Sequence, residues 1–242
     1  MKRNANLTTA ASLVLACALV AAPVMAEEKA AVWTGEAALG FVMTSGNTDT
    51  QSINAKGKAV NERDMWRHSV AVEALSTENN DATTAERYLL SGQSNYKFKP
   101  RHYVFGLANY EDDRFSGYDW RASEAVGYGY RAIDDANLKL DLEGGPGARQ
   151  SKMNNGVRDN EAMLRLAGNL DWKVSDTSSF TEVLTSEIGQ DTTISKSVTG
   201  LKTQINGSLS MKIAYTVKHT SDVPVGIEKV DRETGVMLVY GF

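Results

Sequence analysis

Thr234-Gly-Val-Met-Leu-Val-Tyr-Gly-Phe242, the last nine residues of this 242-residue chain, are the stretch that decides the fold. Side chains alternate between the two faces of a strand, so one face of this segment carries Thr234, Val236, Leu238, Tyr240 and Phe242. Chain ends fray unless something holds them, and a hydrophobic strand that runs to a final aromatic residue therefore needs a partner. Closure of a barrel supplies one, because the last strand then pairs with the first and no sheet edge remains. The segment predicts a barrel; the alternative is the last strand of a soluble sheet.

The N-terminus has the composition of an export signal. Lys2 and Arg3 precede the apolar run 13–24, and Val24-Met25-Ala26 offers small residues at the cleavage positions. An apolar run of that length is too short to span a membrane as a stable helix. A lipoprotein-type anchor at Cys17 is the alternative, and the apolar residues that follow Cys17 disfavour it. We therefore predict a signal peptide over 1–26 and a mature domain over 27–242.

Composition excludes several classes of protein. Cleavage removes Cys17, the only cysteine, so the mature chain has no disulfide framework, no cysteine–zinc site and no thiol nucleophile. Loss of Lys2 and Arg3 takes the formal charge from −4 to −6, and an acidic chain is not expected to bind nucleic acid. The mature chain has no run of about 18 apolar residues, which excludes helical spans but leaves the alternating strands of a barrel allowed.

Alternation of apolar and polar residues predicts strands throughout the mature chain and no helix. About twelve segments alternate; the segments 179–189 and 195–206 are ambiguous in phase. An even number of strands is what single-chain bacterial barrels require. Gly144-Gly-Pro-Gly147 predicts a kink or a strand end. We predict an all-β fold in one domain: a transmembrane, antiparallel, up-and-down β-barrel of about twelve strands.

Short and long connections alternate along the chain. The even-numbered connections are tight, and the odd-numbered ones are generally longer and polar: 77–84, 111–119, 150–158, 190–194 and 220–231. This asymmetry places all short turns at one end, as in outer-membrane barrels with periplasmic turns and extracellular loops.

Charged residues gather on the face opposite the apolar one. An Arg or Lys that faces lipid at mid-membrane costs roughly 2–4 kcal/mol, so this segregation predicts a charged lumen. Glu124 and His68 break the pattern. We expect six residues on adjacent strands to line a narrow lumen: Arg121, Arg131, Lys139, Asp141, Glu143 and Arg165. The mixed signs favour mutual pairing over a strongly selective pore, and a barrel of this size accommodates either a thin channel or a charged plug.

Residues 111–121 form the best candidate for a functional loop. Aromatic residues are unusual in an exposed loop and are expected to fold against the rim or into the lumen; the candidate residues are Asp113, Arg114, Phe115, Tyr118 and Asp119. Carboxylates in this loop suit a divalent cation, but ion pairing with Arg114 and Arg121 is the favoured interpretation, and no metal or cofactor is expected. Aromatic residues near other strand ends suit interfacial girdles: Trp33, Trp66, Tyr96, Phe98, Tyr103, Trp120, Tyr128, Tyr130, Trp172 and Phe242.

The stretch Tyr110-Glu-Asp-Asp-Arg-Phe-Ser-Gly-Tyr-Asp-Trp-Arg121, with 33–41, 44–49 and 127–130, resembles the YdiY-like family. Members of that family are described as salt-induced outer-membrane proteins with a domain of unknown function. The resemblance covers essentially the whole mature chain. It implies an outer-membrane barrel and a link to salt or osmotic stress, and it brings no catalytic or ligand residues.

Catalytic chemistry has little support in the sequence. The three histidines lie far apart, and His219-Thr-Ser221-Asp222 lacks the glycine context and the positioned base of a serine hydrolase. We expect no enzyme and no catalytic residues, but a narrow passive channel or an envelope-adaptation barrel. A non-conducting structural or interaction barrel is the alternative, and an outer-membrane lipid hydrolase is less favoured.

The expected location and partners follow from the barrel prediction. We expect an exported protein of the bacterial outer membrane, with outer-membrane lipid as its surroundings and with the oligomeric state left open. During biogenesis the barrel-assembly machinery is expected to read a C-terminal insertion signal: Val236, Leu238, Tyr240 and Phe242.

Overall fold

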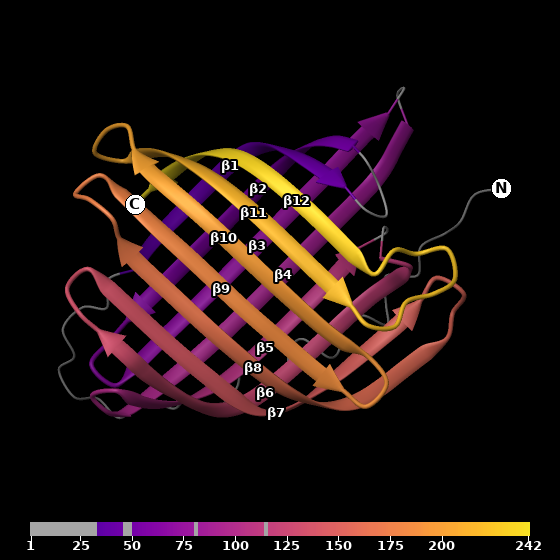
Figure 1. Ribbon diagram of the computed structural model, residues 1–242, viewed down its shortest axis with the longest axis horizontal. Coiled ribbons are helices and arrows are strands. Elements are labelled where there is room, and N and C mark those ends of the chain that lie inside the picture. Colours follow the sequence, from indigo (N-terminus) through magenta and orange to yellow (C-terminus); the bar gives the residue numbers. More distant parts are fainter. Residues whose placement is uncertain (1–32, 46–49, 80–81, 114–115) are drawn as a thin grey trace. The chain divides into compact units, whose positions relative to one another are not determined.

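The computed structural model describes residues 33–45, 50–79, 82–113 and 116–242, which form a closed antiparallel β-barrel (Figure 1). Its twelve strands are β1 (Trp33–Ser45), β2 (Thr50–Glu62), β3 (Trp66–Asn79), β4 (Ala82–Lys99), β5 (His102–Asp113), β6 (Tyr118–Asp134), β7 (Leu138–Met153), β8 (Arg158–Lys173), β9 (Ser178–Gly189), β10 (Thr193–Gln204), β11 (Leu209–Thr220) and β12 (Val230–Gly241). Each strand pairs with its neighbours in sequence, and β12 pairs with β1. No helix among the described residues is long and apolar enough to cross a membrane. The predicted all-β barrel of twelve strands is confirmed.

The last strand closes the barrel as predicted. Phe242 N donates to Gly35 O (3.0 Å) and Gly35 N donates to Phe242 O (2.8 Å), and the ladder continues from Glu36–Gly241 onward. Figure 1 shows β12 in yellow beside β1 in indigo. The alternation is sharp: Phe242 is 65% exposed, whereas the neighbouring inward residues Met237 and Val239 are 3% and 2% exposed.

Apolar side chains cover the outside of the barrel, and charged side chains line the inside. Large apolar residues on the outer face are exposed, for example Ile53 (71%) and Val126 (63%). A water-soluble protein buries such side chains, whereas hydrocarbon accepts them without cost. Apolar residues inside the barrel form two small clusters: Tyr103, Phe105, Leu107, Ala125 and Met163, and Ala38, Ala214, Met237 and Val239.

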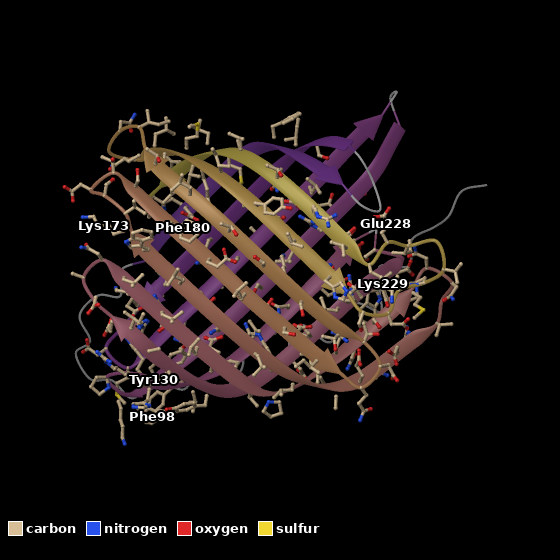
Figure 2. All side chains as sticks on the ribbon, in the orientation of Figure 1. Phe98, Tyr130, Lys173, Phe180, Glu228 and Lys229 are labelled. Atoms are coloured by element: carbon tan, nitrogen blue, oxygen red, sulfur yellow. The ribbon has the colours of Figure 1, made fainter. Side chains whose placement is uncertain are left out.

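The two ends of the barrel differ, and we call them the turn end and the loop end. The turn end holds Phe242 and the connections 63–65, 100–101, 135–137, 174–177 and 205–208; the other connections lie at the loop end. Figure 2 places Phe98, Tyr130, Lys173 and Phe180 at the turn end and Glu228 and Lys229 at the opposite end.

The predicted contrast between short turns and long loops is too large, because most of the loops are shorter than predicted. Strand pairing continues into these segments, over 77–79 and 82–83, over 111–113 and over 150–153, because polar residues at strand ends still satisfy their backbone groups in the ladder. Among the connections that the structure describes in full, only 221–229 is long.

The aromatic girdle appears mainly at the turn end. Trp66 stacks on His68 (ring centroids 5.5 Å apart) and packs against Tyr96, and His68 also hydrogen-bonds Ser94. His68 is thus accounted for as part of the outward girdle. The girdle prediction fails for Tyr103, which points inward, is 6% exposed and donates its hydroxyl to Glu143 (3.0 Å).

Strand β7 continues through the glycine-rich segment, so the predicted strand end is wrong, whereas the predicted kink stays a prediction. A Cβ atom on Gly145 would lie 2.1 Å from Val126 O of β6, so glycine allows the two backbones to approach closely here. Pro146 is in register with Leu164 of β8, and the strand continues to Met153.

Strands β9 and β10 present polar side chains outward, which explains their ambiguous phase. Glu182 accepts hydrogen bonds from Ser197 Oγ (2.7 Å) and Thr199 Oγ1 (2.6 Å), and Ser186 bonds Ser195 (3.0 Å). Glu182 and Ser186 each lie two positions from the exposed Leu184 and therefore share its face. Their partners on β10 lie directly opposite these three residues and point to the same side of the sheet. Paired hydroxyls and a carboxylate thus replace the apolar side chains expected on an outer face.

Candidate functional site: the charged lumen

The loop end of the lumen is partly covered by the β11–β12 loop, residues 221–229. Gly117 of the β5–β6 connection has φ +78°, and a Cβ atom there would lie 3.2 Å from the side chains of both Pro224 and Ile227. Strands β5 and β6 stand six places from β11 and β12 in the strand order, so this contact joins opposite walls. A small pocket beneath it is lined by Ser116, Tyr118, Arg121, Thr220, Val223, Ile227, Glu228 and Asp231.

The predicted loop residues divide between lumen, rim and undescribed positions. Tyr118 is buried (6% exposed) with the Arg121 guanidinium 4.6 Å from its ring centroid, and Asp113 is also buried. Asp119 forms an ion pair with Lys152 at the rim. The expectations for Arg114 and Phe115 fall on positions outside the described residues.

Below this mouth, one carboxylate is held from both walls of the barrel. Glu111 of β5 accepts hydrogen bonds from Arg121 Nη2 (3.0 Å) of β6 and from Lys218 Nζ (2.6 Å) of β11. The three side chains are between 8% and 18% exposed. Because β5 and β11 are opposite strands, this cross-lumen bridge divides the bore.

A second bridge joins β4 to β12. Arg87 Nη2 lies 2.5 Å from Glu73 of β3 and 2.7 Å from Glu233 of β12, and Lys56 of β2 lies 3.1 Å from Glu73. Two cations and two carboxylates therefore neutralise each other at this position. The arrangement holds side chains of four strands together inside the barrel.

Glu143 forms a third network on the wall made by β4, β5, β7 and β8. It accepts hydrogen bonds from Arg165 Nη1 (2.9 Å), Gln93 Nε2 (2.8 Å) and the Tyr103 hydroxyl (3.0 Å). The Arg165 guanidinium also lies 5.5 Å from the Phe105 ring centroid. All three of these partners are donors, so together they stabilise the negative charge of the Glu143 carboxylate.

The turn end has a more open set of charges. Arg131 makes a bidentate pair with Asp141 (2.8 and 3.0 Å), and Lys139, in register with Asp171, is exposed. In the 174–177 turn, Lys173 Nζ donates to Asp176 Oδ1 (2.8 Å) and thereby lowers the pKa of that exposed carboxyl.

The structure thus brings five of the six predicted lumen residues into ion pairs, whereas Lys139 lies at the mouth. Sequence reasoning missed the bridging partners, which come from distant parts of the chain: Arg87, Glu111, Lys218, Glu233, and also Arg149 with Glu161. Strand alternation predicts that several of these residues face inward. It does not predict which residue of another strand lies opposite them across the lumen.

The residues that the sequence offered for catalysis, His219 and Ser221, lie at the loop end of β11. Ser221 Oγ accepts a hydrogen bond from Thr193 N (2.9 Å), and His219 is exposed on β11. Within the described ranges, no three His, Cys, Asp or Glu side chains are grouped to hold a metal ion.

Solved structures with a similar fold are outer-membrane barrels. The NanC porin has a TM-score of 0.57 at 12% identity, covering 84% of this chain and 98% of that one. The translocator domain of the autotransporter NalP from Neisseria meningitidis has a TM-score of 0.53 at 10% identity, over 89% and 90% of the two chains. An outer membrane channel from Pseudomonas putida F1 has a TM-score of 0.52 at 10% identity, over 91% and 100%. At these identities the likeness is one of fold.

Sequence relatives point to one family. A protein of Escherichia coli (strain K12) described as uncharacterized protein YdiY is 29% identical over 202 residues, which is 83% of this chain and 80% of that protein. Residues 37–242 match the family described as protein of unknown function, DUF481, so the predicted YdiY-like resemblance is confirmed. The match extends over nearly all of the barrel, and the chain belongs to the DUF481 family.

Proposed function

We propose that this protein is a narrow passive channel of the bacterial outer membrane. The observation that carries the proposal is the inversion of the barrel: apolar side chains cover the outside, and charged networks line the inside from one end to the other. A barrel of twelve strands is intermediate between small barrels filled by side chains and the wide porins, so it has room for a thin aqueous path. Export by the signal peptide 1–26 and insertion by the assembly machinery belong to this proposal.

The bore admits only small solutes in this proposal. The Glu111–Lys218 bridge crosses between opposite walls, and the Arg87–Glu233 bridge spans from β4 to β12. Charged side chains that face a wet lumen exclude apolar molecules and leave water and small ions as the species that pass between them.

A salt-linked role belongs to this proposal through the lumen ion pairs that water reaches, such as Lys202 with Glu36, whose side chains are 40% and 31% exposed. The Debye length is about 10 Å at 0.1 M salt and about 3 Å at 1 M, so ion pairs that reach lumen water weaken as ionic strength rises. We propose that the bore widens at high salt, which would suit a protein of osmotic adaptation. The conductance should then rise more steeply than the conductivity of the solution when potassium chloride is increased. A strictly proportional rise would contradict this part of the proposal.

Planar-bilayer recording of the purified protein tests the channel. Lys218→Ala removes the bridging side chain but leaves Glu111 paired with Arg121, so it should raise the conductance without orphaning a carboxylate. Lys152→Ala, at the outward rim, is the matched control and should leave the conductance unchanged. Absence of conductance in both the natural protein and Lys218→Ala would overturn the proposal.

The same preparations separate the alternatives. A non-conducting interaction barrel predicts no current but an altered phenotype when residues 114–117, between β5 and β6, are deleted. A lipid hydrolase predicts turnover that is lost when His219 or Ser221 is replaced. Recovery of the protein from the soluble periplasmic fraction, rather than from outer membranes, would contradict the proposed location.

A further inference from the structure

Three lysines and one carboxylate gather on the inner wall near the turn end, and we call them the lysine cluster: Glu36 of β1, Lys58 of β2, Lys202 of β10 and Lys212 of β11. Glu36 is directly opposite Lys58 in the β1–β2 ladder, and Lys202 is directly opposite Lys212 in the β10–β11 ladder. Lys202 Nζ reaches Glu36 Oε2 (3.2 Å), which joins the two pairs across β11 and β12.

The cluster is unlike the rest of the lumen because its cations outnumber its carboxylates. Lys212 and Lys202 are like charges directly opposite each other in the β10–β11 ladder, and the Glu36 carboxylate pairs with Lys202. Lys56 adds little to this excess of positive charge, since it is paired with Glu73 at 3.1 Å. Like charges directly opposite each other in a ladder are destabilising, so this wall carries an excess of positive charge that its own residues leave uncompensated.

The cluster is also reachable from the turn end. The side chains of Lys202 and Glu36 are 40% and 31% exposed, and Lys58 is exposed. The stem of Lys212 lies over Gly200, where a Cβ atom would be 3.1 Å from Lys212 Cε. This glycine leaves room for the stem of Lys212 to lie along the wall.

We propose that the lysine cluster binds a small solute that carries two or more negative charges. Ammonium groups act as point charges with rotatable donors and do not impose the planar, bidentate geometry of arginine, so charge selects the ligand more than shape does. The class of ligand is therefore a phosphate-, sulfate- or polycarboxylate-bearing solute. The role of the site, as a binding position on the solute path, rests on the proposed channel. Binding itself does not require conduction.

Isothermal titration calorimetry of the purified protein in nonionic detergent, at low ionic strength, tests the site with inorganic pyrophosphate as the probe. We expect saturable binding that weakens steeply as salt is added. Lys212→Gln should weaken binding about tenfold, because a charge-assisted donor is lost. Lys212→Arg keeps the charge and should stay within about threefold of the natural protein. Lys152→Gln, on the outward rim at the loop end, should change nothing.

Glu36→Gln gives the sharpest result, because it removes the only carboxylate of the lysine cluster. Pyrophosphate should then bind several-fold more tightly, because the competing negative charge is gone. If Glu36 served only to keep the wall of the barrel intact, its replacement would weaken binding instead. Heat-modifiable gel migration confirms that each variant is folded. No binding to the folded natural protein, equal binding by Lys212→Gln, or weaker binding by folded Glu36→Gln would each overturn the proposal.

Bilayer recording and calorimetry distinguish the proposed channel from the proposed anion site. Conductance without pyrophosphate binding would overturn the anion site and leave the channel standing. Binding without conductance would overturn the channel and leave the site as a property of a closed barrel.

Discussion

At the scale of single residues, Glu111 does more than line the lumen, because it is the shared acceptor of two cations from opposite walls. Glu111→Gln would leave Arg121 and Lys218 facing each other without their carboxylate. Loss of a charged partner in a largely buried position costs about 2 kcal/mol, so we expect a lower midpoint of urea unfolding in detergent micelles.

The double variant Glu111→Gln/Lys218→Gln provides the control for that prediction. It removes one of the two orphaned cations and should recover part of the lost stability, as coupled residues do in a double-mutant cycle. A Glu111→Gln protein as stable as the natural one would show that lumen water already solvates all three charges.

The sequence predicted the inward face of several charged residues, but it did not predict their partners across the lumen. Alternation gave the inward face of Arg131 and Asp141, which are ten residues apart on adjacent strands and do pair. It gave no partner for Glu111 and Lys218, which are 107 residues apart and meet only because the barrel curves round on itself. The two-residue period predicts the face of a strand on which each side chain lies. It does not predict the curvature of the barrel, which brings distant strands together.

At the scale of elements, the β6–β7 ladder depends on the glycines that allow close approach. Gly145→Ala would place a methyl group 2.1 Å from Val126 O, which the backbone of β6 cannot yield cheaply. Overpacking of this kind costs about 1–3 kcal/mol, so the unfolding midpoint should fall. Gly106→Ala on β5 is the matched control, because a Cβ atom there meets nothing within 4 Å. Equal midpoints for the two variants would mean that the strands can spread without cost.

Strand boundaries were the weakest part of the sequence-based prediction. Polar residues in 111–113 and 150–153 indicate loops by composition, yet they continue the ladders because water at the barrel rim accepts polar side chains on both faces. The phase of β9 and β10 was hidden for a related reason: Glu182 and the hydroxyls that bond it occupy outward positions where the pattern expects apolar residues.

At the scale of the whole molecule, closure depends on the β1–β12 seam. Deletion of Phe242 removes two backbone hydrogen bonds to Gly35 and the ring that covers this glycine, whose Cβ position lies 2.5 Å from Phe242 Cζ. Two such bonds contribute only about 1–3 kcal/mol together, but the seam is also the last ladder that can form. We expect the deletion to abolish the fast-migrating folded form on unboiled gels, whereas Phe242→Tyr keeps it. Normal folding of the deletion variant would contradict this role.

The seam has a consequence for chain connectivity. Because Gly35 and Phe242 are hydrogen-bonded partners, a short linker could join Phe242 to Trp33, and new ends could be cut in the exposed 154–157 connection. Such a circular permutant would preserve all twelve ladders while turning Phe242 into an internal residue and giving the chain a different final strand. It would therefore distinguish the role of Phe242 as one edge of the seam from the second role, the proposed part of Phe242 in the insertion signal. A permutant that refolds in detergent but is not inserted in cells would assign the second role to the biogenesis pathway alone.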